Sequence, residues 1–183
     1  MKYGAMNNPA KPLLSEVETI AGLGFDFLEL TMDPPYAHYN QVRTQHKPLL
    51  DLLRDHELEL ICHMPTFVSL ADLTPTIRQA SIAEVLSSLD VAATLKPLKI
   101  VVHPPYIGGM GGYVHEYASS LAMDSLVIIV ERAAELQLEV CLENMFPRAR
   151  FCVEPDDFSV IFNQFSDFNM TKKIDYALLL KIN

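Results

Sequence analysis

Short apolar runs alternate with longer amphipathic stretches along almost the whole chain, and this alternation constrains the fold more than any other feature. Runs typical of buried strands fall at 3–6, 25–31, 58–62 and 98–102, in the first half of 138–148, and between 168 and 174. The stretches between them repeat their apolar positions with helical spacing. Strands and helices that alternate in this way predict a parallel sheet covered by helices. We therefore expect one α/β domain over residues 1–183, built from about six βα units.

Composition and charge disfavour several classes of protein. The net charge of −9 opposes broad contact with a phosphate backbone. The sequence has no signal-peptide pattern at its start and no apolar run long enough to span a bilayer. Its three cysteines, Cys62, Cys141 and Cys152, lack the spacing of a metal site. We therefore expect a cytoplasmic protein that binds neither nucleic acid nor membrane.

Three polar side chains each follow a predicted strand at the point where its apolar run ends. They are His63, His103 and Glu143. Because parallel strands have their carboxyl ends at one edge of the sheet, the three should converge where ligands bind in such folds. Two imidazoles and a carboxylate suit a divalent ion such as Zn²⁺, Mn²⁺ or Mg²⁺. One such histidine alone is more often a buried polar group satisfied by the backbone, but three in register favour a metal site, with Glu143 as the first candidate for catalysis.

Further candidates come from the same edge of the predicted sheet. Glu29 lies near the end of 25–31, and Asp175 follows the last predicted strand. We predict Asp175 as a further metal ligand and Glu29 as a substrate contact. Arg148, beyond the fifth strand, suits a phosphate or carboxylate of a substrate, with a solvated loop as the equal alternative. The glycine-rich segment 108–112 lacks the spacing of a nucleotide-binding loop and indicates a plain loop or a lid.

Local signals predict where some helices begin or break. Ser15, with Glu18 three residues later, predicts a capped helix start. Pro48 lies inside the helical pattern at 40–56 and predicts a kink or two shorter helices. Thr74 followed by Pro75 predicts a cap and a first turn.

Four motifs resemble those of the xylose-isomerase-like TIM-barrel superfamily, which includes sugar-phosphate isomerases and epimerases and endonuclease-IV-type enzymes. They are CHMPTFVSLADL at 62–73, IRQAS at 77–81, IVVHPPY at 100–106 and CLENMFPR at 141–148. The resemblance implies a (β/α) barrel with a divalent metal at its carboxyl edge, near His63, His103 and Glu143. It also implies a small sugar or sugar-phosphate substrate, contacted by Asn144, and proton transfer by Glu143 next to a metal-polarised carbonyl.

The end of the sequence departs from this superfamily. Its members continue with an Asp-x-x-His motif and two further strands. Here Asp175 matches the aspartate, but Leu178 stands where the histidine is expected, and 174–183 does not resemble the superfamily. We therefore expect an incomplete TIM barrel, truncated at the C-terminus, with strands seven and eight missing. Its open edges predict self-association.

Two alternative functions stay open at this point. One is an endonuclease-IV-like phosphodiesterase that cleaves DNA at abasic sites, which the acidic composition disfavours. The other is a non-catalytic remnant of a barrel enzyme. Salt-dependent binding to abasic duplex DNA separates the first alternative from a sugar enzyme, and analysis of bound metal tests the second.

Overall fold

Five strands in the described part of the chain form one parallel sheet. The computed structural model describes residues 1–145 and 151–165. The strands neighbour one another in sequence order. They are β1 (Gly4–Met6), β2 (Phe27–Thr31), β3 (Glu59–His63), β4 (Lys99–Val102) and β5 (Val140–Leu142). The predicted parallel α/β sheet is confirmed, and the sixth predicted strand, 168–174, lies outside the described residues.

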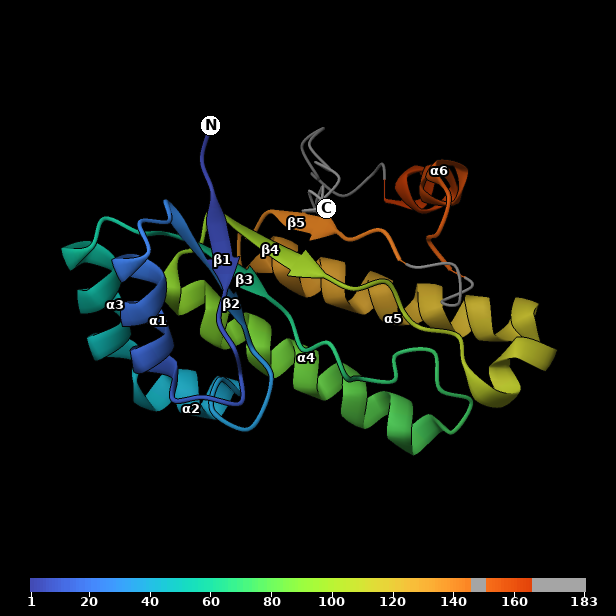
Figure 1. Cartoon of the computed structure of the whole chain (residues 1–183). Helices are drawn as coiled ribbons and strands as arrows, with labels where there is room; N and C mark the ends of the chain where they lie inside the picture. The colour runs from blue at the N-terminus through green and yellow to red at the C-terminus, as the bar shows by residue number, and fades with distance from the viewer. Residues whose placement is uncertain (146–150, 166–183) are drawn as a thin grey trace.

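Helices follow the strands in alternation, as the sequence predicts. They are α1 (Leu13–Gly22), α2 (Tyr39–Thr44), α3 (His46–Asp55), α4 (Pro75–Leu95), α5 (His115–Glu135) and α6 (Pro155–Gln164), with a 3₁₀ helix η1 (Gly109–Tyr113) before α5. The two long helices, α4 and α5, run side by side along the sheet (Figure 1). None of the described helices is both long and apolar enough to cross a lipid bilayer.

The strands present alternate residues to the two faces of the sheet. The side chains that pack against the helices are apolar: Leu28, Leu30, Leu60, Cys62, Ile100, Val102, Val140 and Leu142. On the opposite face, the register pairs Thr31 with His63, and His63 with Val101. Glu29 lies two residues before Thr31 and therefore shares this face. The opposite face thus carries polar side chains near its carboxyl edge.

Two of the three helix predictions are confirmed, and one is wrong. Helix α1 begins at Leu13, so Ser15 lies inside the first turn instead of capping it. Leu13 is buried, and its packing places the helix start three residues earlier than the capping signal does. The pattern at 40–56 does form two shorter helices, with the break at Gln45, and Pro48 falls in the first turn of α3, where proline is tolerated. Pro75 is the first residue of α4 and Thr74 is its N-cap residue, as predicted, but the Thr74 side chain makes no capping hydrogen bond.

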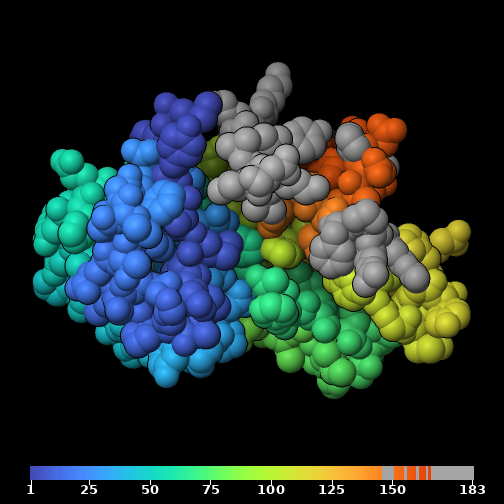
Figure 2. Space-filling model, viewed as in Figure 1, coloured from blue at the N-terminus to red at the C-terminus, as the bar shows by residue number. Residues whose placement is uncertain are grey.

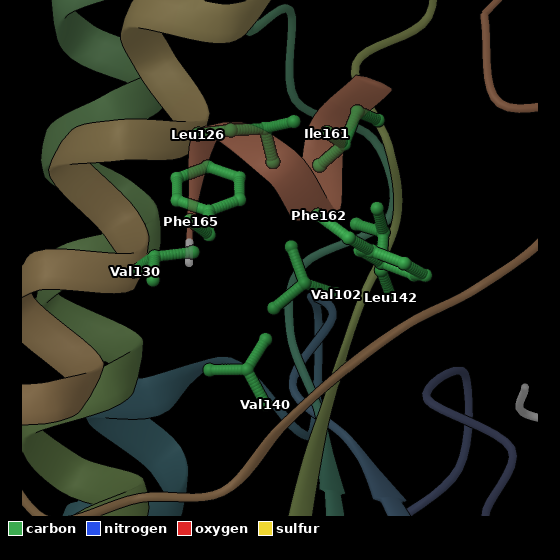
Figure 3. Close-up of a pocket in the computed structure, with 8 residues that line it drawn as sticks. All are labelled: Val102, Leu126, Val130, Val140, Leu142, Ile161, Phe162 and Phe165. Atoms are coloured by element: carbon green, nitrogen blue, oxygen red, sulfur yellow. The ribbon is translucent and has the colours of Figure 1, made fainter. Parts of the chain in front are cut away.

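Helix α6 is fixed to the sheet by an apolar contact that also supports β5. Its residues pack with β4, β5 and α5 around a small gap (Figure 3), lined by Val102, Leu126, Val130, Val140, Leu142, Ile161, Phe162 and Phe165. Asp157 Oδ2 accepts hydrogen bonds from the backbone N–H groups of Val153 (2.8 Å) and Glu154 (3.0 Å). These bonds cap the start of the helix, with Glu154 as its N-cap residue. The packing holds β5, and Glu143 directly follows that strand.

Candidate metal centre

His63, His103 and Glu143 meet at the carboxyl edge of the sheet. His63 is the last residue of β3, and the other two directly follow β4 and β5. Three atoms form a small triangle: Nε2 of His63 and Nε2 of His103 are 3.1 Å apart, and Glu143 Oε2 lies 3.3 Å from the first and 2.9 Å from the second. Residues forty positions apart in the sequence therefore present their ligand atoms to one point.

The triangle fits a divalent metal ion. In a tetrahedral site with bonds of about 2.0–2.1 Å, neighbouring ligand atoms lie roughly 3.3 Å apart. The three separations, 2.9–3.3 Å, agree with this spacing to within a few tenths of an ångström. Two imidazole nitrogens and one carboxylate oxygen are the donors that zinc and manganese accept in proteins. The cluster can therefore hold such an ion with little movement of its side chains.

The backbone fixes which nitrogen of His63 faces the cluster as an acceptor. His63 Nδ1 lies 2.9 Å from the carbonyl oxygen of Met64. Because a carbonyl only accepts, Nδ1 must carry the proton. In the neutral ring Nε2 is then the unprotonated nitrogen that is available to a metal ion, and in the doubly protonated ring Nε2 donates to Glu143 Oε2. A metal-binding histidine is typically oriented by a hydrogen bond of this kind from its other nitrogen.

Electrostatics in the cluster favour an anionic Glu143. Burial would raise the pKa of its carboxyl, but hydrogen bonds from His103 and His63 outweigh burial and lower that pKa to about 2. For His63, burial would lower the pKa, yet the hydrogen bonds to Glu143 and the Met64 carbonyl outweigh it, so the pKa is raised. A proton on His63 is therefore stabilised, and a metal ion must compete with it for Nε2.

Glu29 places a second carboxyl group beside the cluster. It is half-buried on the same face of the sheet. Burial raises the pKa of Glu29; the histidines His63 and His103 oppose this, and the negative charge of Glu143 adds to it, leaving a net rise. Glu29 thus takes up a proton more readily than an ordinary glutamate, while Glu143 resists one.

The remaining predicted site residues are Asn144, Arg148 and Asp175, together with the glycine-rich segment 108–112. Asn144 is exposed next to Glu143 and contributes no atom to the triangle. Arg148 and Asp175 lie outside the described residues, so their predicted roles stay predictions. The glycine-rich segment 108–112 forms much of η1 instead of an extended loop.

A cavity of about 500 Å³ opens between the loops that follow β3 and β4. Ser69, Asp72, Thr74 and Tyr106 line it together with the glycines of η1. Figure 2 shows the segments after β3 (green) and at the start of α5 (yellow) side by side at the surface. Its volume is in the range of small-molecule sites. Both loops follow a histidine of the cluster and so leave the sheet on its carboxyl side, but the residues that line the cavity do not include those of the triangle.

Two residues at this rim were not predicted as part of a site. Asp33 is buried, and its carboxyl accepts hydrogen bonds from Thr31 Oγ1 (2.6 Å) and the Thr66 N–H (2.9 Å). Asn7 directly follows β1, and its Oδ1 accepts the Thr31 N–H (2.9 Å). Its buried Nδ2 has no hydrogen-bond partner among the described residues. Each is a polar residue one or two positions beyond a strand, which is a local signal for a place at the rim, but the burial of Asp33 has no local signal.

Comparison with known proteins places the chain in a family. The model of the Xylose isomerase-like TIM barrel family matches residues 17–170. A D-tagatose 3-epimerase-like protein is 24% identical with a TM-score of 0.77, over 88% of this chain and 60% of its own. D-psicose 3-epimerase from Clostridium cellulolyticum H10, solved with D-tagatose, is 18% identical with a TM-score of 0.70, over 93% and 61%. No curated protein matches the chain by sequence.

A metal-containing structure is also similar to this chain. It is a Xylose isomerase-like TIM barrel protein from Mycobacterium smegmatis in complex with magnesium, 13% identical with a TM-score of 0.66, over 92% of this chain and 63% of that one. At these identities the likeness establishes the fold, and the chain spans about 60% of the length of the solved relatives. The described sheet is accordingly part of a TIM barrel. The family match and the shared fold together show that this chain belongs to the Xylose isomerase-like TIM barrel family.

Proposed function

We propose that this protein is a metal-dependent isomerase or epimerase of a small sugar or sugar phosphate. The observation that carries the proposal is the triangle of His63, His103 and Glu143, whose ligand atoms are spaced for one divalent ion. Similar structures that are named as sugar 3-epimerases support the choice of substrate class. Zn²⁺, Mn²⁺ and Mg²⁺ all remain candidates for the ion. Self-association also remains a prediction.

Two carboxyl groups with opposite pKa shifts divide the chemistry. A bound metal would polarise the carbonyl of the sugar and so acidify the adjacent C–H bond. Glu143, with its lowered pKa, stays ionised, so it would serve as a metal ligand and as a carboxylate beside the polarised carbonyl. Glu29, with its raised pKa, is the better proton carrier near neutral pH. Groups whose pKa values are pushed apart are typical of paired acid and base roles.

Proton exchange in D₂O tests the proposal directly. The purified chain, loaded with Mn²⁺, Co²⁺ or Zn²⁺ in turn, is incubated in D₂O with a panel of ketoses and their phosphates. We expect deuterium at the carbon next to the carbonyl of at least one sugar, followed by NMR. Glu143→Gln, which keeps the shape of the side chain and removes its charge, should abolish this exchange. Exchange that persists at the wild-type rate in Glu143→Gln contradicts the assigned role.

Metal affinity should fall as the pH is lowered. The pKa of His63 is raised above its ordinary value, so its proton competes with the metal up to a higher pH than for an ordinary histidine. Below that pKa, each displaced proton weakens binding by about tenfold per pH unit. Calorimetric titration with Zn²⁺ across a pH series, with the proton release measured from buffers of different ionisation enthalpy, checks this. An affinity that does not change between acidic and neutral pH contradicts it.

A further inference from the structure

Asp33 is a buried carboxyl group that the proposed chemistry does not use. It lies two residues beyond β2 and is 4% exposed. Its Oδ2 accepts the hydroxyl of Thr31 (2.6 Å), and its Oδ1 accepts the backbone N–H of Thr66 (2.9 Å). A carboxyl group buried this deeply destabilises a fold unless its oxygens are satisfied. Both oxygens of Asp33 are satisfied. One partner, Thr31, is the last residue of β2, and the other, Thr66, lies in the loop after β3.

Both partners of Asp33 are close to His63, one on the neighbouring strand and one further along the same segment. Thr31 pairs with His63 in the strand register, and the N–H of Met32 donates to the His63 carbonyl (2.9 Å). Thr66 lies three residues beyond His63. The segment 63–66 is therefore tied to the end of β2 at its start by the strand pairing and at its end by Asp33.

Met64 lies between His63, which pairs with β2, and Thr66, which bonds Asp33, and its carbonyl orients the ring of His63. Its N–H donates to the Val101 carbonyl (2.8 Å), and its own carbonyl accepts the His63 Nδ1–H (2.9 Å). The position of that carbonyl fixes the proton on Nδ1 and leaves Nε2 as the ligand atom. Releasing Thr66 removes the constraint on the loop two residues beyond this carbonyl.

We propose that Asp33 is a positioning residue for the metal centre. It holds the loop after β3 so that the Met64 carbonyl keeps His63 in the tautomer and orientation needed for ligation. The metal-binding part of this inference rests on the proposed function, whereas the effect on the His63 tautomer does not. Loss of a group that hydrogen-bonds a metal ligand typically weakens metal binding by about 10–100-fold. Asp33 acts through the loop that carries such a group, so we expect an effect at the low end of this range, about tenfold.

Three variants test this role. Asp33→Ala removes both acceptors, and Asp33→Asn keeps an oxygen for the Thr66 N–H. Ser88→Ala is the control, because Ser88 is fully buried in α4 and, among the described residues, its hydroxyl bonds only to the Glu84 carbonyl of the same helix. Co²⁺ is the probe: its affinity comes from titration, and its visible absorption bands report the ligand geometry. The His63 tautomer in the metal-free protein comes from ¹⁵N NMR of the ring nitrogens.

We expect Asp33→Ala to bind Co²⁺ about tenfold more weakly, with altered absorption bands and a neutral His63 ring that is no longer held in the Nδ1–H tautomer. Asp33→Asn should recover most of the affinity, and Ser88→Ala should bind as the wild type does. A general loss of stability would lower the melting temperature in both alanine variants without changing the absorption bands. Only a change in the site itself moves the bands and the tautomer.

Failure of this inference is distinguishable from failure of the metal centre. If wild type and Asp33→Ala bind Co²⁺ equally with the same spectrum, the role of Asp33 is overturned and the metal centre stands. If the wild type binds no Co²⁺, the proposed function fails, and the His63 tautomer decides for or against Asp33. If Asp33→Ala does not fold, Thr31→Val carries the test, because it removes only the hydroxyl that orients the Asp33 carboxyl. Weaker binding or a changed tautomer then supports the role, and wild-type behaviour in both overturns it.

Discussion

Replacing His63 with alanine is expected to weaken divalent-metal binding by at least about a hundredfold. Loss of an orienting hydrogen bond alone typically weakens binding about 10–100-fold, and this variant removes a ligand atom. Only His103 Nε2 and Glu143 Oε2, 2.9 Å apart, then remain from the triangle, and two donors hold a divalent ion poorly. Isothermal titration with Zn²⁺ and Mn²⁺ measures the loss, and metal analysis of the purified protein gives an independent value.

His56→Ala is the matched control for this substitution. His56 is exposed at the C-cap of α3. It precedes the start of β3, whereas His63 is the last residue of that strand, so its loss should leave metal affinity unchanged. Near-UV circular dichroism of both variants shows whether each retains packed tertiary structure. If His63→Ala keeps the native spectrum and binds Zn²⁺ as tightly as the wild type, the proposed centre is wrong.

The convergence of His63, His103 and Glu143 was predictable because it depends on local signals alone. Each residue stands where an apolar run stops, and a parallel sheet brings such positions to one edge whatever the details of the connections. The sequence therefore indicates that the three residues share a rim. Their separations of 2.9–3.3 Å depend on side-chain orientation, including the bond from His63 to the Met64 carbonyl, which a residue pattern does not contain.

Asp33 shows what a local pattern misses. In the sequence it precedes two prolines and indicates a turn, and the chain does turn there. Its burial, however, comes from the loop after β3, whose Thr66 N–H it accepts from 33 positions along the chain. Ser15 gives the opposite error, since its capping signal is real but the burial of Leu13 decides where the helix starts. In both cases tertiary contacts outweigh the local sequence signal.

For Glu29, the position at the rim was predictable from the sequence, but its pKa shift was not. Its place near the end of a strand predicted a position at the rim, and the structure puts it on the face that carries His63. Its raised pKa arises first from burial and then from the balance of charges on His63, His103 and Glu143. That balance depends on three segments far apart in the sequence. A carboxyl group at the rim is thus foreseeable, whereas its readiness to hold a proton is not.

Leu89→Ala is expected to lower the free energy of unfolding by about 3 kcal/mol, because truncating a leucine that is buried in a packed core leaves a cavity. Leu89 is fully buried in α4, the helix that connects the strands carrying His63 and His103. Leu23→Ala is the matched control: Leu23 is 70% exposed, and its loss should change stability by no more than about 0.5 kcal/mol. Urea denaturation of both variants measures the difference, and equal midpoints contradict the packing described for α4.

Metal addition links this stability to the proposed centre. A ligand that binds only the folded state at about 100 times its Kd stabilises that state by about 2.7 kcal/mol. Saturating Zn²⁺ should therefore return most of the stability that Leu89→Ala loses, because Leu89 packs in the core and leaves the triangle of His63, His103 and Glu143 intact. In the double variant Leu89→Ala/His63→Ala the same addition should have little effect. Equal rescue of both variants would show that Zn²⁺ acts elsewhere on the protein.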